Sequence, residues 1–402
     1  MTTQAQGIQA GQSVAVGLSG LTDPSTAGSQ AARMATKQLE GRRPRCAIVF
    51  GSSWFDQEVL LRGVDSVLDG VPIVGGSTAG ELTPDGPQSH TCVVVAIADD
   101  RLVMSIGLGE RIQNNPRLAG HEAAQQAMRQ LNQSTRSGLL FFGDGLATGY
   151  DEVMHGIHEV LGTSSVMAGA LMGDDLRFTR TYQYGHNRAH TGSVVAVVFG
   201  GGRIGVGLEH GFSPISKLRQ ITRAHGNIIY EIDGQPAASV YKEYFGADEL
   251  ALGPMPTRIT ALSMYPIGIR HELSGRYLLR SVLGISKDGS LSCTGQMPVG
   301  EWLQMMIGTR DLALQAASLA AQQAVQMLRT VRFVLVFDSI VRQRALVKEP
   351  AGTLQRVRET VGPSVPIVGC YTYGELGPLG GTAPFGMSAP QIGCCLVVAV
   401  GS

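Results

Sequence analysis

The sequence has little charge and no excess of either sign. Charged residues make up 16% of the 402 residues, and 32 Lys and Arg residues balance 32 Asp and Glu residues. Such a chain has no overall field that attracts nucleic acid or an anionic membrane, so we expect neither as a partner. With 44% hydrophobic residues it can bury large cores, which excludes a disordered chain.

Long apolar runs are absent as well. The longest, such as 194–199 and 396–400, are far shorter than the roughly 20 residues that a membrane helix needs. The first residues, Met1–Ala10, contain neither a basic segment nor an apolar one, so we do not expect a signal peptide. These absences predict a cytoplasmic protein.

The six cysteines show no Cys-x-x-Cys spacing. A zinc site and a disulfide framework are therefore not indicated. Most of the cysteines lie in apolar, strand-like segments, which favours buried free thiols.

Glycine is abundant, and it marks a repeat. The chain has 53 glycines, about twice the usual share. The segment 71–84 returns near the C-terminus at 365–378, with Val-Pro-Ile-Val-Gly, Thr, Gly-Glu-Leu and Pro in register. Self-similarity of this kind indicates a duplicated architecture, with the junction between strand and turn as its recurring element.

The chain around these junctions alternates between short strands and helices. Apolar strands at 46–50, 139–142 and 333–337 are each followed by a helix and a second strand. We also expect hairpins, 90–98 with 101–107 and 194–199 with 203–208.

The pattern predicts an α/β fold with mixed sheets. Its two related domains are built from repeated β-α-β-plus-hairpin units. The expected boundaries are a polar lead-in at 1–28, a first domain at 29–218 and a second domain at 219–402.

Four segments together resemble FIST domain proteins: Gly75–Glu81, Ala168–Asp175, Ile232–Ala237 and Gly369–Glu375. The resemblance covers roughly residues 30–400 and implies a FIST N domain followed by a FIST C domain. It implies a sensory module that binds a small ligand. Some stand-alone members bind haem, sense nitric oxide and regulate a histidine kinase. This chain resembles them, because no output domain remains once both halves are assigned.

One segment departs from the family pattern. After the first strand of the last domain the family commonly has a Cys followed by an Arg. This chain has Ser339 in place of the Cys and retains Arg342. The resemblance therefore implies no thiol role at this position.

A haem site requires an axial donor, apolar walls and usually a cation for the propionates. His186 and His190 flank Arg188 at a predicted strand-turn-strand tip, where an imidazole can project without breaking a core. The resemblance then implies non-covalent haem b, because the chain has no Cys-x-x-Cys-His segment. His190 is the preferred iron ligand since it adjoins the apolar strand 194–199, His186 is the alternative, and His210 ranks behind both. Two solvated loop histidines would give the same pattern.

The second hypothesis is a haem-free sensor of amino acids or another small metabolite, with the repeated loops as its site. Glu81 and Glu375 are the repeated carboxylates. They either accept backbone N–H groups and fix the loop, or grip an amine or cation of the ligand.

The two loops differ in their aromatic content. Tyr371 and Tyr373 in the second copy replace Ser77 and Ala79 in the first, which makes the second loop a better wall for a flat ligand. We include Ser77, both tyrosines and Arg342 in the predicted ligand set.

A third hypothesis is an enzyme that uses Ser52, Ser53 or Asp144, because these residues follow strands, where α/β proteins bind ligands. The serines do not form the Gly-x-Ser-x-Gly turn of a nucleophile elbow. We therefore expect ligand binding without catalysis. The ligand would be nitric oxide or an amino acid and the partner a two-component histidine kinase, and the oligomeric state stays open.

Overall fold

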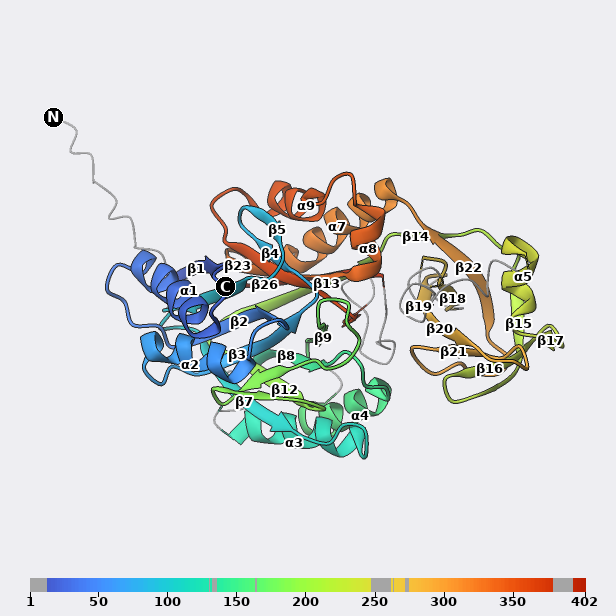
Figure 1. Ribbon diagram of the computed structural model, residues 1–402, viewed down its shortest axis with the longest axis horizontal. Coiled ribbons are helices and arrows are strands. Elements are labelled where there is room, and N and C mark those ends of the chain that lie inside the picture. The colour runs from blue at the N-terminus through green and yellow to red at the C-terminus, as the bar shows by residue number, and fades with distance from the viewer. Residues whose placement is uncertain are drawn as a thin grey trace.

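The structure is a computed structural model that describes residues 13–129, 131, 136–162, 165–246, 262, 264–271, 275–378 and 393–402. It has a larger α/β body and a smaller, β-rich lobe formed within residues 212–308 (Figure 1). The α/β class with mixed sheets and repeated units, expected from the sequence, is confirmed.

The body contains three repeats. The first comprises β1 (Val14–Ser19), α1 (Pro24–Gln38), β2 (Cys46–Ser52), α2 (Gln57–Leu68), β3 (Ile73–Thr78), β4 (Glu81–Thr83), β5 (Gly86–Gln88) and β6 (Cys92–Ile97). The second comprises β7 (Val103–Gly109), α3 (Pro116–Arg129), β8 (Arg136–Asp144), α4 (Tyr150–Leu161), β9 (Met167–Met172), β10 (Gln183–Gly185), β11 (Arg188–His190) and β12 (Val194–Gly200). The third comprises β13 (Arg203–His210), α7 (Arg310–Val325), β23 (Val331–Ser339), α8 (Ile340–Ala345), α9 (Gly352–Val361), β24 (Ile367–Thr372), β25 (Gly374–Leu376) and β26 (Cys394–Gly401).

The lobe is inserted in the third repeat, between β13 and α7. It comprises β14 (Phe212–Pro214), β15 (Arg219–His225), β16 (Ile228–Ile232), β17 (Gln235–Pro236), α5 (Ser239–Phe245), β18 (Ile267–Arg270), β19 (Tyr277–Arg280), β20 (Val282–Ile285), β21 (Leu291–Cys293) and β22 (Trp302–Gly308). The predicted boundary between residues 218 and 219 falls inside this lobe, and β1 with the start of α1 falls within the predicted lead-in.

Every repeat arranges its four long strands in the same order. The orders are β1-β6-β2-β3, β7-β12-β8-β9 and β13-β26-β23-β24. In each sheet the last two strands of this order run parallel and the other neighbours run antiparallel. The identical order shows that the three repeats share one plan.

Short strands are exchanged between the repeats in a closed cycle. β4 of the first repeat pairs with β24 of the third, β25 of the third pairs with β9 of the second, and β10 of the second pairs with β3 of the first. Each repeat therefore completes its sheet with a strand from a neighbour, so the body is one interlocked unit.

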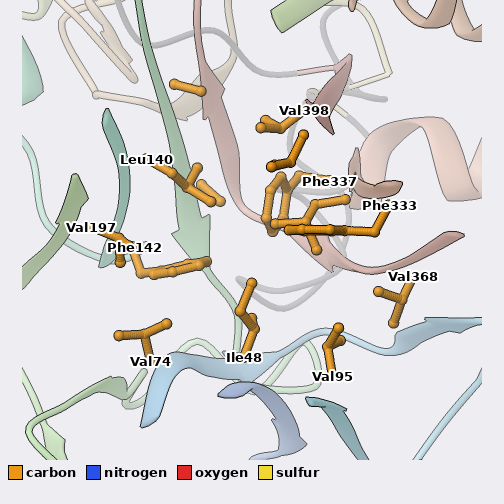
Figure 2. Packing of buried hydrophobic residues seen from close by; sticks show 14 of the residues in the cluster. Ile48, Val74, Val95, Leu140, Phe142, Val197, Phe333, Phe337, Val368 and Val398 are labelled. Carbon is orange, nitrogen blue, oxygen red and sulfur yellow. The ribbon is translucent and has the colours of Figure 1, made fainter. Parts of the chain in front are cut away.

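The three sheets turn one face toward a common core. Phe50, Phe142 and Phe337 come from the same position in the three repeats, and their rings meet edge to face with centroids 5.9 to 6.3 Å apart. Figure 2 shows Phe142 and Phe337 among the apolar side chains of this core. The opposite faces of the sheets pack against α1 and α2, α3 and α4, and α7 and α9. Because both faces are covered, the central strands have nearly continuous apolar sequences.

The predicted hairpins 90–98 with 101–107 and 194–199 with 203–208 are wrong. β6 pairs with β1 and β2, whereas β7 crosses to the second sheet and pairs with β12. In the same way, β12 pairs with β8 in the second sheet, whereas β13 pairs with β26 in the third. Each pair is joined by a short turn, but the turn leads from the last strand of one repeat to the first strand of the next.

The repeated Val-Gly has a steric reason. A Cβ atom on Gly75 would lie 2.0 Å from the Val49 oxygen, and one on Gly369 would lie 1.7 Å from the Val336 oxygen. Both contacts are to the backbone of the neighbouring parallel strand, which cannot move aside. Only glycine fits at this point of the sheet.

Two expectations from composition have structural counterparts. All six cysteines are buried, and none of them forms a disulfide, as predicted. No helix in the described part of the chain is both long and apolar enough to cross a membrane.

Candidate functional site

A polar pocket lies beside the carboxyl ends of β2 and β3. The loop 173–182, which we call the arginine loop, joins β9 to β10 and lies across this edge of the first repeat. Between them is a hollow of about 270 Å³ lined by Ser53, Arg177, Thr179, Arg180 and Tyr182. Ligands of α/β proteins commonly bind outside the carboxyl ends of parallel strands.

Asp175 fastens the arginine loop to the first repeat. Its Oδ2 accepts hydrogen bonds from the Ser52 hydroxyl at 2.9 Å, the Ser53 amide at 2.7 Å and the Ser53 hydroxyl at 2.7 Å. Its own amide donates to the Thr78 carbonyl at 2.9 Å. The position of the loop is thus fixed from both strand ends.

Asp174 shapes the interior of the loop and is itself buried. Its carboxylate accepts the backbone N–H groups of Phe178 at 2.8 Å, Thr179 at 2.6 Å and Arg180 at 2.8 Å. The Tyr373 hydroxyl, from the third repeat, donates to the same carboxylate, and the Tyr373 ring stacks on Phe178 at 4.8 Å. The loop therefore contacts all three repeats.

The loop holds strained backbone. Asp175, Leu176 and Phe178 have φ values of 53°, 62° and 52°, in the left-handed region that residues with a Cβ avoid. Each such residue costs of the order of 1–3 kcal/mol and persists only where its surroundings dictate it, which is typical of ligand-binding segments.

The two charged side chains that line the pocket are both arginines. The Arg177 and Arg180 side chains are exposed, and neither guanidinium has an ion pair or hydrogen bond among the described residues. Both neighbouring aspartates accept several backbone or hydroxyl donors, and in the described part of the chain neither forms an ion pair with these arginines. The Arg177 guanidinium lies 5.5 Å from the ring centre of Trp54, a residue that is 64% exposed.

The predicted carboxylates Glu81 and Glu375 lie inside the body, beneath the junctions. Thr78 and Thr372 donate to them at 2.5 and 2.6 Å, from the same relative position. Burial raises the pKa of Glu81 to about 7, partly offset by hydrogen bonds from Thr78 and Thr91, and burial also raises the pKa of Glu375. Their partners are hydroxyl and backbone groups, the arrangement expected of carboxyls that fix the loop.

Three other predicted ligand residues also support the junctions from within. The Ser77 hydroxyl donates to the Gly173 carbonyl at 2.7 Å and accepts the Tyr182 amide at 2.8 Å, so it anchors both ends of the arginine loop. Tyr371 and Tyr373 are buried. The structure thus places Ser77 and Tyr373 next to the pocket wall without making them part of its lining.

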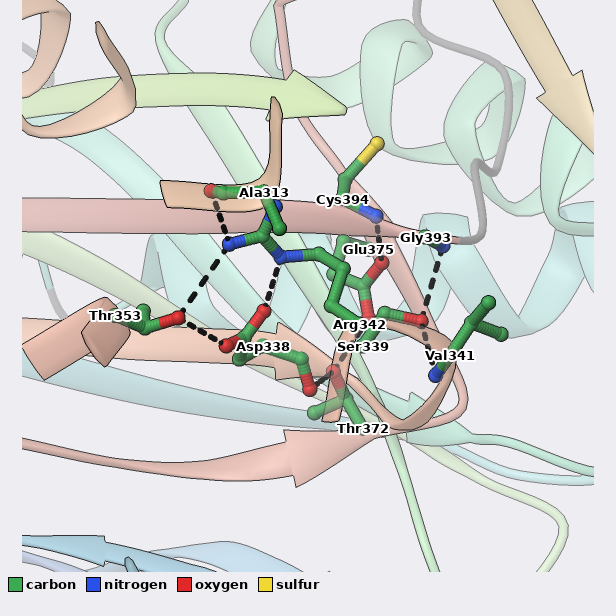
Figure 3. A network of polar contacts seen from close by, with 10 residues as sticks. All are labelled: Ala313, Asp338, Ser339, Val341, Arg342, Thr353, Thr372, Glu375, Gly393 and Cys394. Carbon is green, nitrogen blue, oxygen red and sulfur yellow. Dashed lines mark hydrogen bonds and ion pairs between the residues drawn. The ribbon is translucent and has the colours of Figure 1, made fainter. Parts of the chain in front are cut away.

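Arg342 belongs to a buried polar network at the end of β23 (Figure 3). Its Nε pairs with Asp338, and its Nη2 donates to the Ala313 carbonyl at 2.9 Å. Thr353 donates to the second Asp338 oxygen at 2.7 Å. Burial opposes the charge of Arg342, but Asp338 more than offsets this, so the pKa of the guanidinium is raised.

The position that commonly carries a Cys, Ser339, caps α8 in that network. Its hydroxyl accepts the amides of Val341 at 3.4 Å and Gly393 at 3.0 Å.

The histidines predicted for haem lie at the β10–β11 tip, which forms the predicted strand-turn-strand. His186 is exposed in the turn and, with Asn187, lines a hollow of about 240 Å³ whose apolar walls include Met104 and Ile106. His190 is half-buried, and its Nε2 lies 3.2 Å from the Gly185 carbonyl oxygen.

This hollow is smaller than the about 300–1,000 Å³ of pockets that enclose drug-sized ligands. His186 fits as an imidazole donor, but the described walls would not enclose a haem. Arg188, the predicted propionate partner, is exposed. His210 lies away from this tip, opposite Cys394 in the β13–β26 pair, and burial lowers its pKa.

The residues of the enzyme hypothesis have structural partners. Ser52 and Ser53 donate to Asp175, and among the described residues neither contacts a histidine or lysine that would act as a base. Asp144 is buried and accepts the Thr181 hydroxyl at 2.7 Å and the Leu146 amide at 2.9 Å.

Comparison with protein families matches the FIST N domain over residues 45–235 and the FIST C domain over residues 237–378. The chain belongs to the FIST family. FIST domains are, in general, sensory domains that bind small ligands in signalling proteins. Comparison of this FIST protein with curated proteins gives no match.

Solved structures similar to this FIST protein are distant in sequence. Cyanuric acid hydrolase from A. caulinodans is 10% identical with a TM-score of 0.35, and 97% of this chain and 98% of that chain are covered. A second cyanuric acid hydrolase structure gives 10% identity and a TM-score of 0.34, over 96% and 98% of the two chains. PurLQS from Thermotoga maritima gives 13% identity and a TM-score of 0.22, over 96% and 71%.

The sequence prediction missed the two arginines of the pocket. It identified the junction that ends in Asp174 and Asp175 but not the Arg-x-x-Arg that follows as Arg177 and Arg180. The missed signal was two adjacent carboxylates directly after a buried strand, followed at once by two closely spaced arginines.

Proposed function

We propose that this FIST protein senses a small polar molecule by binding it, without turnover, in the pocket beneath the arginine loop. The observation that supports the proposal is the construction of that loop. Asp174 and Asp175 hold its strained backbone in one shape while Arg177 and Arg180 keep unpaired guanidiniums, in the described part of the chain, at a hollow of about 270 Å³. Binding sites organised before the ligand arrives lose less entropy on binding.

The same loop offers a route from binding to signalling. It contacts the first repeat through Asp175 and the third through Tyr373. A ligand that changes the loop therefore changes contacts among all three repeats. Following the family resemblance, we propose a two-component histidine kinase as the partner that reads this change.

A thermal-shift screen of small polar molecules tests the proposal. We expect at least one compound to raise the melting temperature of the wild type and of Ser29→Phe, which alters a separate hollow on α1. Thr179→Phe, which fills the pocket, should abolish the shift. A shift that persists in Thr179→Phe would place the site elsewhere. If mass spectrometry shows that the protein converts the bound compound into a product, binding without turnover is contradicted.

A second candidate function is non-covalent haem binding with nitric oxide as the ligand. The exposed His186 imidazole beside Met104 and Ile106 supplies an iron donor for it, and because the described hollow does not enclose a haem, such a haem would bind at an open surface. On this geometry His186 ranks ahead of His190, whose Nε2 faces a carbonyl oxygen. We expect a Soret band in protein reconstituted with haem that is lost in His186→Ala and shifts with nitric oxide. A band that survives in the His186→Ala, His190→Ala double variant would contradict both ligands, and the absence of any band would contradict haem.

A further inference from the structure

We infer that the ligand of the arginine-loop pocket carries an oxyanion, a carboxylate or a phosphate, and that its binding draws Arg177 away from Trp54. The inference rests on the proposed function, since it concerns the same pocket. It adds the chemical class of the ligand and a local event that reports its arrival.

The charges around the pocket support an anion. Asp174 and Asp175 are the carboxylates of the arginine loop, and both are engaged by donors of the loop and of the first repeat. Arg177 and Arg180 remain without an ion pair within the described ranges. A ligand that supplies negative charge would complete the site.

The hydrogen-bonding groups of the lining point the same way. The Ser53 hydroxyl donates to Asp175 at 2.7 Å, and the Thr179 hydroxyl donates to Asp174 at 3.3 Å. Their hydrogens are therefore already directed at protein oxygens. The guanidiniums hold the unused N–H donors of this lining, in the planar fork that matches two oxygens of a carboxylate or phosphate.

The contact between Arg177 and Trp54 is weak enough to be exchanged. A guanidinium over an exposed aromatic ring shifts an equilibrium by only about two- to fivefold. A charge-assisted hydrogen bond to an oxyanion contributes about tenfold or more. Because the Arg177 guanidinium lies 5.5 Å from the Trp54 ring centre, an oxyanion in the pocket would win this competition. The environment of the indole would then change.

Tryptophan fluorescence tests the inference directly. The chain has two tryptophans, so Trp302→Phe leaves Trp54 as the sole reporter. In this background we would titrate inorganic phosphate and, separately, succinate. We expect a saturable change in Trp54 emission with at least one of the two. The emission change should be lost in Arg177→Gln, which removes the contact that reports binding, and the dissociation constant should rise about tenfold or more in Arg180→Gln.

Matched controls separate the pocket from general ionic effects. Arg62→Gln, on the solvent side of α2 and without an ion pair among the described residues, should leave the titration unchanged. Circular dichroism melts check that the variants are folded. Added sodium chloride should weaken binding, because ions screen exposed charges. Phosphate and succinate distinguish a tetrahedral from a planar oxyanion.

Each outcome has a defined meaning. No emission change with either anion, or a change that Arg177→Gln and Arg180→Gln leave intact, would overturn the inference. A neutral compound whose thermal shift is lost in Thr179→Phe but kept in both arginine variants would also overturn it, while leaving the proposed function standing. Failure of the proposed function would give a different result, namely binding that Thr179→Phe does not affect.

Discussion

Gln183 occupies in the second repeat the place that Glu81 occupies in the first. The Gln183 Oε1 accepts the Ser193 amide at 3.2 Å, directly before β12, as the Glu81 Oε2 accepts the Thr91 amide at 3.2 Å, directly before β6. The Gln183 Nε2 donates to the Thr181 hydroxyl at 3.0 Å, which corresponds to the contact between Glu81 and Thr78. A neutral amide therefore makes the corresponding hydrogen bonds at this junction. The buried glutamates thus do not need a negative charge to form it.

Glu81→Gln should remove a pH dependence of stability. Burial raises the pKa of Glu81 from 4.5 to about 7, so between these values the folded state binds more protons than the unfolded state. The stability that the neutral carboxyl provides is fully present below pH 4.5 and is lost as the pH rises to about 7. At pH 8 we expect the variant to be more stable than the wild type by about 3 kcal/mol, from about 1.4 kcal/mol per pKa unit.

Urea unfolding at pH 5, 6.5 and 8 measures this effect. The exposed Glu110→Gln serves as the control and should follow the wild type at every pH. Parallel pH profiles for the wild type and Glu81→Gln would mean that Glu81 titrates normally in the folded protein.

Truncation of one ring in the central triangle should destabilise the whole body. Phe337→Ala removes a fully buried ring that contacts Phe50 and Phe142. We expect a loss of about 3–5 kcal/mol in the free energy of unfolding, measured by urea denaturation. Leu319 on α7 is 40% exposed, so Leu319→Ala should cost no more than about 0.5 kcal/mol. Unfolding that proceeds in separate steps for the three repeats would contradict a shared core.

The Asp338 and Arg342 pair should show strong coupling. Removal of either partner, as Asp338→Leu or Arg342→Met, leaves a buried charge alone and should cost about 3–5 kcal/mol. The double variant should cost much less than the sum, because neither charge is left. A double-mutant cycle in urea measures the coupling, with the exposed Arg356 and Glu359 pair as a control of at most about 1 kcal/mol. Additive losses at Asp338 and Arg342 would refute the coupling.

Asp174→Ala should loosen the arginine loop. The change removes the acceptor of three backbone N–H groups and of the Tyr373 hydroxyl. Hydrogen exchange should accelerate at Phe178, Thr179 and Arg180, consistent with a local cost of about 1–3 kcal/mol. Asp85→Ala, in an exposed turn, should leave exchange of this loop unchanged. Unaltered protection in Asp174→Ala would show that the loop is shaped by other contacts.

The sequence was sufficient to find the repeats, because glycines such as Gly75 and Gly369 are required by sterics that recur wherever the sheet recurs. It was not sufficient to find strand partners. β6 and β7 are adjacent along the chain and have the right turn between them, yet they pair in different sheets. Alternation and turn residues report local conformation, whereas pairing depends on the distant sheet that each strand completes.

The site was predictable only in part, for a related reason. The strand ends after β2 and β9 could be located, and Ser53 and Asp175 belong to them. Glu81 and Ser77 stood out because they lie in repeated segments. Their hydrogen bonds hold the junctions together from inside, so the repetition of these segments indicates a structural role. Arg177 and Arg180 belong to no repeated segment, so comparison between copies gives no signal for residues that only one copy has.

The closed cycle of exchanged strands also governs the order in which the protein is completed during synthesis. The second sheet takes its edge strand, β25, from Gly374–Leu376. The ribosome must therefore deliver most of the third repeat before the second repeat can close its sheet. We expect nascent chains to keep the edge of β9 unpaired until late in translation, when all three repeats can assemble in concert.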